Sequence, residues 1–368
     1  MTLRLIADDI TGALDTAAEF TGLCGAMDIA WGDAPPASGS LAIDAGTREV
    51  NRDAARARIA ALAPALREAE VAYCKIDSLL RGHAAAQIGA CFGLGGWTHC
   101  IVAPAFPAQG RVTRGGRQWA RGPDGAWSPV GADDLPGLLA AEGLRAQVAT
   151  RDSTPGPGIT VCDAETEDDL LRVAALGRRL PGPVLWCGSG GLARALAGGA
   201  ALVPCTALAA PMLGLFGSDQ PATARQLAAC GEAWVRIADG GAADARRVAQ
   251  RLAQTGAALV SVALPQGIGR EAAATRIAAA MTALTAGIDR PGTLIVAGGE
   301  TLRALCAGLG ATHLAATGIV APGVPRSVMR GGRWDGVAIV SKSGAFGGDT
   351  LWRDLLAGNG LNLGGIPS

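Results

Sequence analysis

Short apolar runs alternate along this chain with longer stretches rich in Ala, Leu and Arg, and this alternation limits the folds open to it. The predicted strands are residues 3–7, 71–76, 99–104, 183–187, 212–216, 234–238, 258–264, 293–297 and 336–341. The predicted helices are residues 12–24, 52–69, 79–91, 164–179, 191–198, 221–231, 242–255, 269–286, 300–309 and 350–357. The pattern predicts α/β layers on mostly parallel sheets, because nearly continuous apolar runs suit strands that are covered on both faces.

The 368 residues are enough for two or three domains with large cores. Residues 195–211 are rich in small residues, contain two prolines and precede a new predicted strand, so they predict a linker. We therefore predict one domain at 1–204 and a second at 205–368. Residues 110–135 are rich in Gly, Arg and Trp, and they predict a long excursion or hairpin.

Composition narrows the functional classes. Charged residues make up 17% of the chain and the formal net charge is zero, so there is no general attraction to nucleic acid or anionic membranes. No apolar run reaches spanning length, and two acids interrupt the short apolar stretch at the N-terminus, so we do not expect a signal peptide. We expect a cytoplasmic protein without nucleic-acid or membrane partners. Nine cysteines without a CxxC pair, and only three histidines, argue for buried thiols and against a structural zinc site.

Polar or Gly-rich turns follow five of the predicted strands, at positions where ligands bind in doubly wound sheets. They are ADDITGA (7–13), KIDSLLRG (75–82), APAFPAQGR (103–111), AGGET (297–301) and SKSGAFGG (341–348). A structural α/β protein needs only a turn and a helix cap at such points. These turns also carry acids, arginine, hydroxyls and the only two lysines of the chain, Lys75 and Lys342.

The first turn presents Asp8 and Asp9 directly after a strand. Asp9 or Thr11 could simply cap the following helix. Alternatively, one carboxylate binds substrate hydroxyls or accepts a proton from one of them. Two adjacent acids are costly unless they are solvated, paired or bound to a cation.

The KIDSLLRG turn places Lys75, Asp77, Ser78 and Arg81 within seven residues. If a helix begins at Ser78, its N-terminus lies between two cationic groups and attracts an anion. The alternative is a capped helix with an Asp–Arg pair. Arg48 is a third basic candidate, and the three cations together suit a ligand that carries a carboxylate.

The second half of the chain has a different character. Gly-rich turns occur in LFGSDQPATARQL (215–227), AGGETLRAL (297–305), GIVAPGVPRS (318–327) and SKSGAFGG, and we predict a loop at 318–327. Backbone N–H groups in such turns can surround phosphates. A plain tight turn explains any one of them, whereas four in one domain favour a phosphate site.

Two competing motifs are weak. There is no GxxxxGK[ST] sequence, so no P-loop is present. GSGGLA (188–193) follows a strand and fits a loose dinucleotide pattern, but no acid occurs about 20 residues further on, where a ribose ligand is expected. A nicotinamide-dependent oxidoreductase that uses residues 188–193 is therefore the weaker enzyme hypothesis.

Taken together, the motifs resemble the four-carbon acid sugar kinase family. The resemblance rests on IADDITGALDTAAEF, KIDSLLRGH, PAFPAQGR, CDAETEDDL, GSGGLARAL, GSDQPATARQ, GGETLRAL, APGVP and KSGAFGG, in this order along most of the chain. It implies an N-terminal α/β domain for an acid sugar, a C-terminal α/β domain for ATP, and an active-site cleft between them. The implied reaction is phosphoryl transfer to a terminal hydroxyl of threonate, erythronate or 3-oxo-tetronate.

The resemblance also implies roles for particular residues. The substrate-binding set would be Asp8, Asp9, Arg48, Lys75, Asp77, Ser78 and Arg81. The nucleotide-binding set would be Ser218, Gly298, Gly299, Glu300, Pro322, Gly323 and Gly344, with Lys342 near the phosphates. Mg²⁺ would bridge phosphate oxygens, and one of Asp8, Asp9 or Asp77 would act as the base, with Asp9 favoured. The residues do not predict the metal ligands.

Departures from the family pattern lie on the substrate side. Residues 119–137 are shorter than the usual segment, and IDAGTREV replaces a more usual Ser-Arg ending. A third hypothesis is therefore a non-catalytic protein that binds a sugar acid. A homodimer is a further expectation that the sequence supports only weakly.

Overall fold

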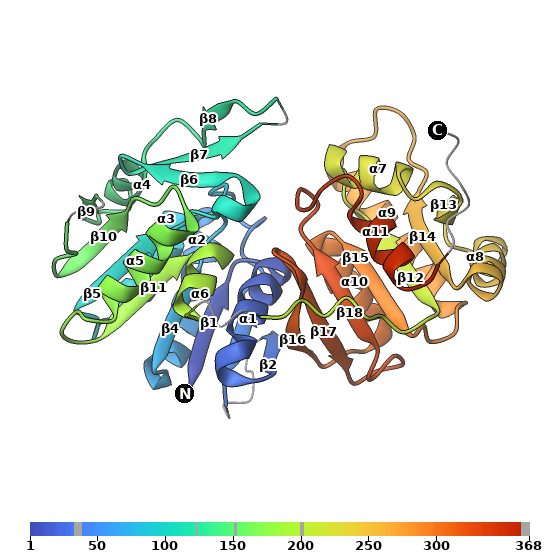
Figure 1. The fold of residues 1–368 in the computed structure, drawn as a ribbon, viewed down its shortest axis with the longest axis horizontal. Coiled ribbons are helices and arrows are strands. Elements are labelled where there is room, and N and C mark those ends of the chain that lie inside the picture. The colour runs from blue at the N-terminus through green and yellow to red at the C-terminus, as the bar shows by residue number, and fades with distance from the viewer. Residues whose placement is uncertain (33–38, 123, 151–152, 199–201, 362–368) are drawn as a thin grey trace. The chain divides into compact units, whose positions relative to one another are not determined.

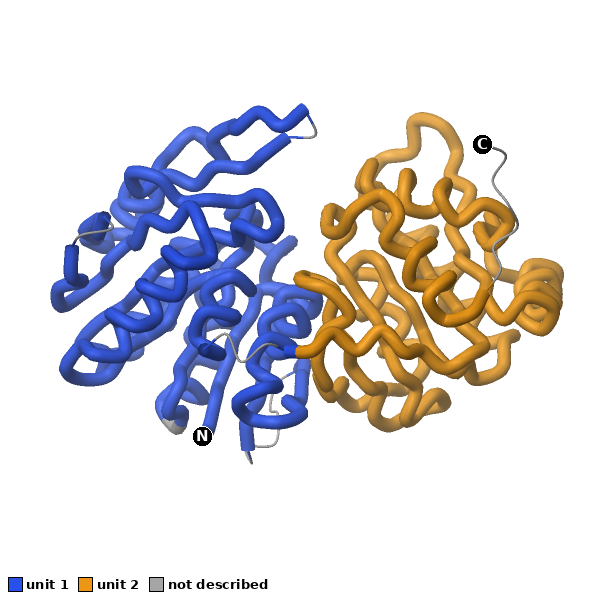
Figure 2. Tube along the Cα trace, viewed as in Figure 1, with its two compact units in different colours: residues 1–202 blue, residues 203–368 orange. Residues whose placement is uncertain are grey.

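The computed structural model describes residues 1–32, 39–122, 124–150, 153–198 and 202–361. The chain divides into two compact units, residues 1–202 and 203–368 (Figure 2). Residues 199–201 of the predicted linker lie outside the described residues. None of the described helices combines the length and the apolar character that crossing a membrane requires.

The first unit is built on a parallel sheet (Figure 1). Its strands in spatial order are β2 (Met27–Trp31), β3 (Leu41–Asp44), β1 (Leu3–Ala7), β4 (Val71–Lys75), β11 (Val184–Gly188), β5 (His99–Ala103), β10 (Gly158–Cys162) and β9 (Ala146–Ala149). The sheet separates two helical layers: α1 (Ile10–Cys24), α5 (Glu167–Gly177) and α6 (Gly190–Leu196) pack together, as do α2 (Arg52–Leu62), α3 (Ala84–Gly93) and α4 (Leu135–Ala140). Strand side chains alternate between the layers: Ile6 packs with Ile59 and Ile88, whereas Tyr73 packs edge-to-face on Phe20.

A small antiparallel sheet extends from this unit. It consists of β6 (Arg111–Arg114), β7 (Arg117–Arg121) and β8 (Trp127–Pro129), as the composition of residues 110–135 predicts. Asp163 attaches its first turn to the unit, because one carboxylate oxygen accepts from the Gly115 N–H and the other from the Gly116 N–H, both at 2.8 Å. The predicted helix 52–69 ends as an α-helix at Leu62, before Pro64, and continues as a 3₁₀ turn (Ala63–Glu68).

The second unit has a mixed sheet. Its strands in spatial order are β13 (Trp234–Ile237), β14 (Ala257–Val262), β12 (Met212–Phe216), β15 (Thr293–Ala297), β18 (Ala338–Lys342), β17 (Val324–Arg330) and β16 (His313–Ala321). The first five strands are parallel to one another. Strand β17 runs antiparallel to both of its neighbours, β18 and β16. One layer contains α7 (Pro221–Ala228) and α11 (Leu351–Gly358), and the other contains α8 (Ala242–Thr255), α9 (Arg270–Ala286) and α10 (Gly299–Leu309).

All nine predicted strands are present, but two other predictions were wrong. The segment predicted as a loop at 318–327 is mostly strand: it holds the end of β16, a two-residue turn at 322–323 and the start of β17, and Gly323 lets the chain reverse with a φ of 73°. The helix predicted at 79–91 begins only at Ala84, because Leu80 (φ 54°) and Gly82 (φ 75°) have left-handed backbone that no α-helix accommodates. Strands β2, β3, β9, β10, β16 and β17 were not predicted.

Candidate active site

The predicted substrate residues of the first unit lie at one edge of its sheet. Ala7, the last residue of β1, pairs with Asp44 of β3 on one side and with Lys75 of β4 on the other. The segments that follow these strands therefore emerge side by side. They bring together Asp8 and Asp9 after β1, Arg48 after β3, and the Lys75–Arg81 turn after β4.

Arg48 is the centre of this group. Its Nε donates to Asp8 Oδ2 at 2.7 Å and its Nη2 donates to Asp8 Oδ1 at 2.9 Å. The guanidinium also binds Asp9, and its Nη2 lies 3.5 Å from Asp77 Oδ1. Arg48 thus compensates three carboxylates from segments that are distant in the sequence, and a ligand carboxylate would have to compete with them.

Burial makes these charges interdependent. The side chains of Asp8 and Asp77 are only 4% and 8% exposed. Burial raises the pKa of Asp8 even though Arg48 opposes the rise. The pKa of Asp77 is held well below its usual range despite burial, because Arg81 and Arg48 stabilise the carboxylate. The Asp8 and Asp9 charges raise the pKa of Arg48 against the effect of its burial.

Asp9 also caps helix α1. Its Oδ1 accepts from the Gly12 N–H and its Oδ2 from the Thr11 hydroxyl, both at 2.7 Å. The interpretation of Asp9 as a helix cap is therefore confirmed. Asp9 is also the most exposed of the three carboxylates, at 18% of its side chain. A Cβ on Gly12 would lie 2.8 Å from Asp9 Oδ1 and 2.9 Å from Lys75 Nζ, so a larger residue at this position would have to displace these two groups.

The turn after β4 is organised by Asp77 and is not a helix N-terminus. Asp77 Oδ2 accepts from the Leu79 N–H at 3.0 Å and from Arg81 Nε at 2.9 Å, and Asp77 Oδ1 accepts from Arg81 Nη2 at 2.7 Å. The prediction that a helix N-terminus at Ser78 binds an anion was wrong, because α3 begins six residues later. Ser78 itself is buried in the turn.

Lys75 is the cation of this edge that remains available. Its side chain is buried, and among the described residues its ammonium forms no hydrogen bond or ion pair. Asp8, Asp15 and Asp77 lie close enough for its charge to lower their pKa values. A buried ammonium surrounded by acids but bound to none of them is positioned to receive an anionic or hydroxyl ligand.

Two residues near this group escaped the sequence prediction. Arg111 is buried, and its charge interacts with those of Asp77 and Arg81. The sequence signal that could have predicted it is its position at the end of PAFPAQGR. Asp15 is buried in α1, where burial raises its pKa to about 6 although Lys75 opposes the rise. An acid within the apolar helix ITGALDTAAEF was the available signal for Asp15.

Glu19, one helical turn beyond Asp15, should make stability fall as the pH rises. Its Oε1 has no hydrogen-bond partner among the described residues, and Arg194 Nε lies 3.6 Å from Oε2. Burial, with a further contribution from Asp15, raises its pKa from 4.5 to about 8. The folded state therefore binds more protons between pH 4.5 and 8, so the stability present below pH 4.5 is lost as the pH rises through 8.

We expect Glu19→Gln to exceed the wild type in free energy of unfolding above pH 8, by an amount on the order of a few kcal/mol. Urea titrations from pH 5 to 9 measure this. The control is Glu271→Gln, at an exposed position in the first turn of α9, which should follow the wild-type pH dependence. If Glu19→Gln and wild type ran parallel across this range, Glu19 would be ionised in the folded state.

The predicted nucleotide residues gather at one sheet edge in the second unit. The last residues of three neighbouring strands are in register: Phe216 with Ala297, and Ala297 with Lys342. Strand β17 is antiparallel to β18, so the Pro322–Gly323 turn that precedes it lies at this same edge. The edge therefore holds all eight predicted residues, namely Ser218, Gly298, Gly299, Glu300, Pro322, Gly323, Lys342 and Gly344.

These turns approach one another closely. A Cβ on Gly344 would lie 1.8 Å from Ser218 Oγ, and a Cβ on Gly298 would lie 3.6 Å from the Ser218 N–H nitrogen. Gly298 also has a φ of 112° and precedes α10, whose first N–H groups have no side-chain cap. Lys342 Nζ donates to the carbonyl oxygens of Ser343 and Gly344, and burial lowers its pKa to about 7.

The glycines of GSGGLA have a packing role. Ser189 caps α6, and a Cβ on Gly191 would lie 2.5 Å from the Ala105 carbonyl oxygen. A Cβ on Gly190 would lie 2.8 Å from Asp15 Oδ2. These residues are buried against their own unit, so the nicotinamide hypothesis is not favoured.

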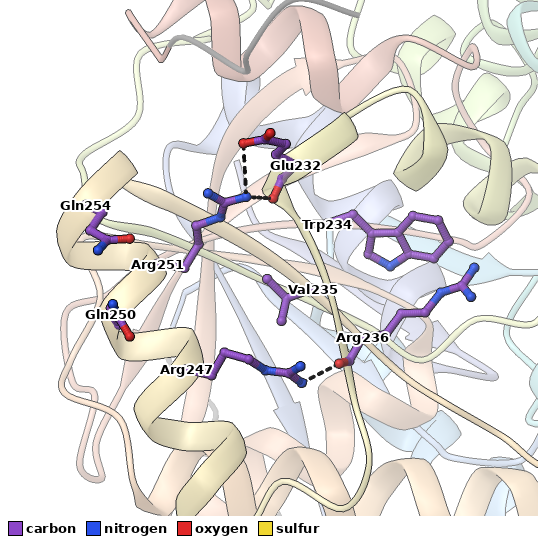
Figure 3. A pocket seen from close by; sticks show the side chains of 8 residues that line it. All are labelled: Glu232, Trp234, Val235, Arg236, Arg247, Gln250, Arg251 and Gln254. Carbon is purple, nitrogen blue, oxygen red and sulfur yellow. Dashed lines mark hydrogen bonds and ion pairs between the residues drawn. The ribbon is translucent and has the colours of Figure 1, made fainter.

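A surface hollow of about 640 Å³ lies elsewhere in the second unit, beside the edge strand β13 (Figure 3). Arg247 of α8 donates to the Arg236 carbonyl oxygen at 2.5 Å, and Arg251 donates to that of Glu232. These arginines satisfy backbone groups at an open sheet edge, which protects such an edge from pairing with other chains. The hollow contains no predicted site residue.

Comparison with known proteins assigns each unit to a described domain. Residues 3–137 match the family described as a sugar-binding N-terminal domain. Residues 213–351 match the family described as a nucleotide-binding C-terminal domain. The two matches correspond to the two groups of turns described above.

Full-length relatives and a solved structure extend this result. The chain is 35% identical to a D-threonate kinase from Cupriavidus necator, over 96% of this chain and 97% of the relative. It is 29% identical to a 3-oxo-tetronate kinase from Methylobacterium radiotolerans, over 95% and 97%. The crystal structure of Haemophilus influenzae protein HI1011 has the same fold, with a TM-score of 0.70 and 19% identity over 97% of this chain and all of that one. The chain belongs to the four-carbon acid sugar kinase family.

Proposed function

We propose that this protein is an ATP-dependent kinase that phosphorylates a terminal hydroxyl of a four-carbon acid sugar of the threonate, erythronate or 3-oxo-tetronate type. The observation that carries the proposal is the group at the edge of the first sheet, where three carboxylates and two arginines converge with a buried lysine that forms no ion pair with another described residue. Relatives named for D-threonate and 3-oxo-tetronate match this chain over nearly its whole length, which supports this substrate class.

The predicted N-terminal domain, residues 1–204, would hold the acid sugar. The carboxylate of such a substrate needs a cation that is not already held in an ion pair, and Lys75 forms none with the other described residues. Sugar hydroxyls need acceptors, which Asp8 and Asp9 provide. Arg81 and Ser78 would line the same site, and Arg48 would hold the carboxylates in position.

The predicted C-terminal domain, residues 205–368, would hold ATP. Its Gly-lined turns and the uncapped start of α10 offer backbone N–H groups to phosphates. Mg²⁺ supplies charge neutralisation when it arrives with the nucleotide, and it usually keeps several waters and binds only one or two carboxylates. Among the described residues, no group of three or more His, Cys, Asp and Glu side chains is placed to hold a metal ion.

Asp9 is the favoured base for the attacking hydroxyl. Asp77 is committed to Arg81, and Asp8 accepts two hydrogen bonds from Arg48. Asp9 also accepts from Arg48, from the Gly12 N–H and from the Thr11 hydroxyl, but it is more exposed than either Asp8 or Asp77, and the cap of α1 keeps its carboxylate in one orientation. Phosphoryl transfer requires that the sugar hydroxyl and the γ-phosphate meet, and we predict that they meet in a cleft between the two domains. A homodimer also remains a prediction.

A coupled ADP-release screen tests the proposal. The purified protein is given ATP and Mg²⁺ with D- and L-threonate, D- and L-erythronate and their 3-oxo forms. We expect ADP release with at least one of these acids and none without an acid. If no acid released ADP but one raised the melting temperature, the protein would be a non-catalytic sugar-acid-binding homologue.

Lys342 predicts a pH dependence of nucleotide binding. With a pKa of about 7, the ammonium loses its charge as the pH rises above that value, and phosphates lose a partner. ATP affinity should weaken by up to about tenfold per pH unit above 7. Calorimetric titrations at pH 6 to 9 should show this slope for the wild type and a flat profile for Lys342→Met. The control is Lys75→Met, the only other lysine, which should keep the wild-type slope.

A further inference from the structure

The turn that carries Asp77 and Arg81 is held from outside by the β6–β7 hairpin. Gln118 of β7 points its amide into the unit and is 1% exposed. Its Nε2 donates to the Ser78 carbonyl oxygen at 2.9 Å and to the Pro104 carbonyl oxygen at 3.4 Å. Its Oε1 accepts from the hydroxyl of Thr113, which is fully buried.

The chemistry of the partners determines the amide orientation. Both carbonyl oxygens can only accept hydrogen bonds, so the NH₂ group of Gln118 must face them. The amide oxygen then needs a donor, which is the Thr113 hydroxyl directly across the hairpin. All the polar groups of this pair are satisfied, and removing the hydroxyl would leave a buried acceptor without a partner.

The hairpin is in turn attached to the body of the unit. Thr113 exchanges two backbone hydrogen bonds with Ala164, at 2.9 and 3.0 Å. The neighbouring glycine N–H groups bind Asp163. A continuous set of hydrogen bonds therefore runs from residues 163–164 through Thr113 and Gln118 to the backbone of Ser78.

The turn that it reaches needs such support. Leu80 has a φ of 54°, a conformation that leucine rarely adopts, and it is two residues from Ser78. Strained residues of this kind persist only when the surroundings restrain them. Asp77 restrains the turn from within, whereas Gln118 restrains it from the hairpin.

We propose that Gln118, oriented by Thr113, is a positioning residue that sets affinity for the acid sugar by holding the Asp77–Arg81 turn in its strained conformation. This inference rests on the proposed function. Gln118 acts through the backbone of Ser78, so it should affect the acid-sugar site and leave the nucleotide site unchanged.

The test compares Thr113→Val, Thr113→Ser and Gln118→Leu with the wild type in the ADP-release assay, with thermal unfolding in parallel. Thr113→Val keeps the side-chain shape and should raise KM for the acid sugar by about tenfold, the equivalent of one buried hydrogen bond. Gln118→Leu should raise it at least as much. Thr113→Ser should restore the wild-type value, and KM for ATP should stay within twofold throughout.

Ser128→Ala, at an exposed position of β8 in the same small sheet, is the control for unspecific disturbance. Thr113→Val would overturn the inference if it lowered the melting temperature while KM for the acid sugar stayed within twofold, or if both KM values rose together. A wild type that released no ADP with any acid would overturn the proposed function and this inference with it. If the wild type is active, the proposed function stands, and the variants then test the role of Gln118 by itself.

Discussion

Replacing Asp9 with asparagine is expected to lower the turnover number for phosphoryl transfer by about 10²- to 10⁴-fold. Asparagine cannot accept the proton of the attacking hydroxyl, but it caps a helix about as well as aspartate does. Helix α1 should therefore keep its start at Ile10, and KM for the acid sugar should change little. Steady-state kinetics with saturating ATP give both parameters.

The chain offers a matched control for this substitution. Asp134 caps α4 with the same geometry, since its Oδ1 accepts from the Gly137 N–H at 2.7 Å. Asp134→Asn should leave the turnover number at the wild-type value. If Asp9→Asn stayed within threefold of wild type, Asp9 would be a cap alone, and Asp8 would become the next candidate for the base.

Replacing Arg48 with methionine is expected to destabilise the protein by about 3–5 kcal/mol and to abolish activity, because it leaves a group of buried carboxylates without their shared cation. Without Arg48 the carboxylates of Asp8, Asp9 and Asp77 repel one another, so protonating Asp8, whose pKa burial already raises, should relieve part of the damage. The stability difference from wild type should be largest near pH 7 and shrink toward pH 4. Urea unfolding at several pH values measures this difference.

Arg52→Met is the control for Arg48→Met. Arg52 is half-exposed and pairs with Glu142 at 2.6 Å, and pairs of this kind typically contribute less than about 1 kcal/mol. A second control is the double variant Arg48→Met with Asp8→Asn, which should recover part of the lost stability. Equal effects of Arg48→Met and Arg52→Met would mean that the acids at this edge are solvated.

Much of the site could be predicted because it depends on local pattern. Asp8 and Asp9, the Lys75–Arg81 turn and the second unit's Gly-rich turns each follow an apolar run, and parallel strands bring such turns to one edge. The strands themselves were visible as uninterrupted apolar segments. Strand β2 was missed because Asp28 interrupts its apolar run, and β3 because its apolar run is only three residues long. Polar residues interrupt β16, and a proline and polar residues interrupt β17.

The helix start was predicted wrongly for a physical reason that the sequence does not display. Ser78 to Gly82 contain no proline, and Leu79 and Leu80 favour helix. The Asp77 carboxylate competes with helical hydrogen bonding by binding the N–H of Leu79 and the side chain of Arg81. Gln118, 40 residues away, then holds the resulting turn.

The sequence by itself determined the α/β class, the division into two groups of strand-end turns, and the residue types that each group presents, because these follow from periodicity and spacing along a few residues. Only the tertiary structure decided that Arg48 binds three acids, that Lys75 forms no ion pair with another described residue, and that Glu19 is buried with one carboxylate oxygen near Arg194. These properties depend on which distant segments meet and on how much water they exclude, and neither quantity is encoded in any short stretch of the chain.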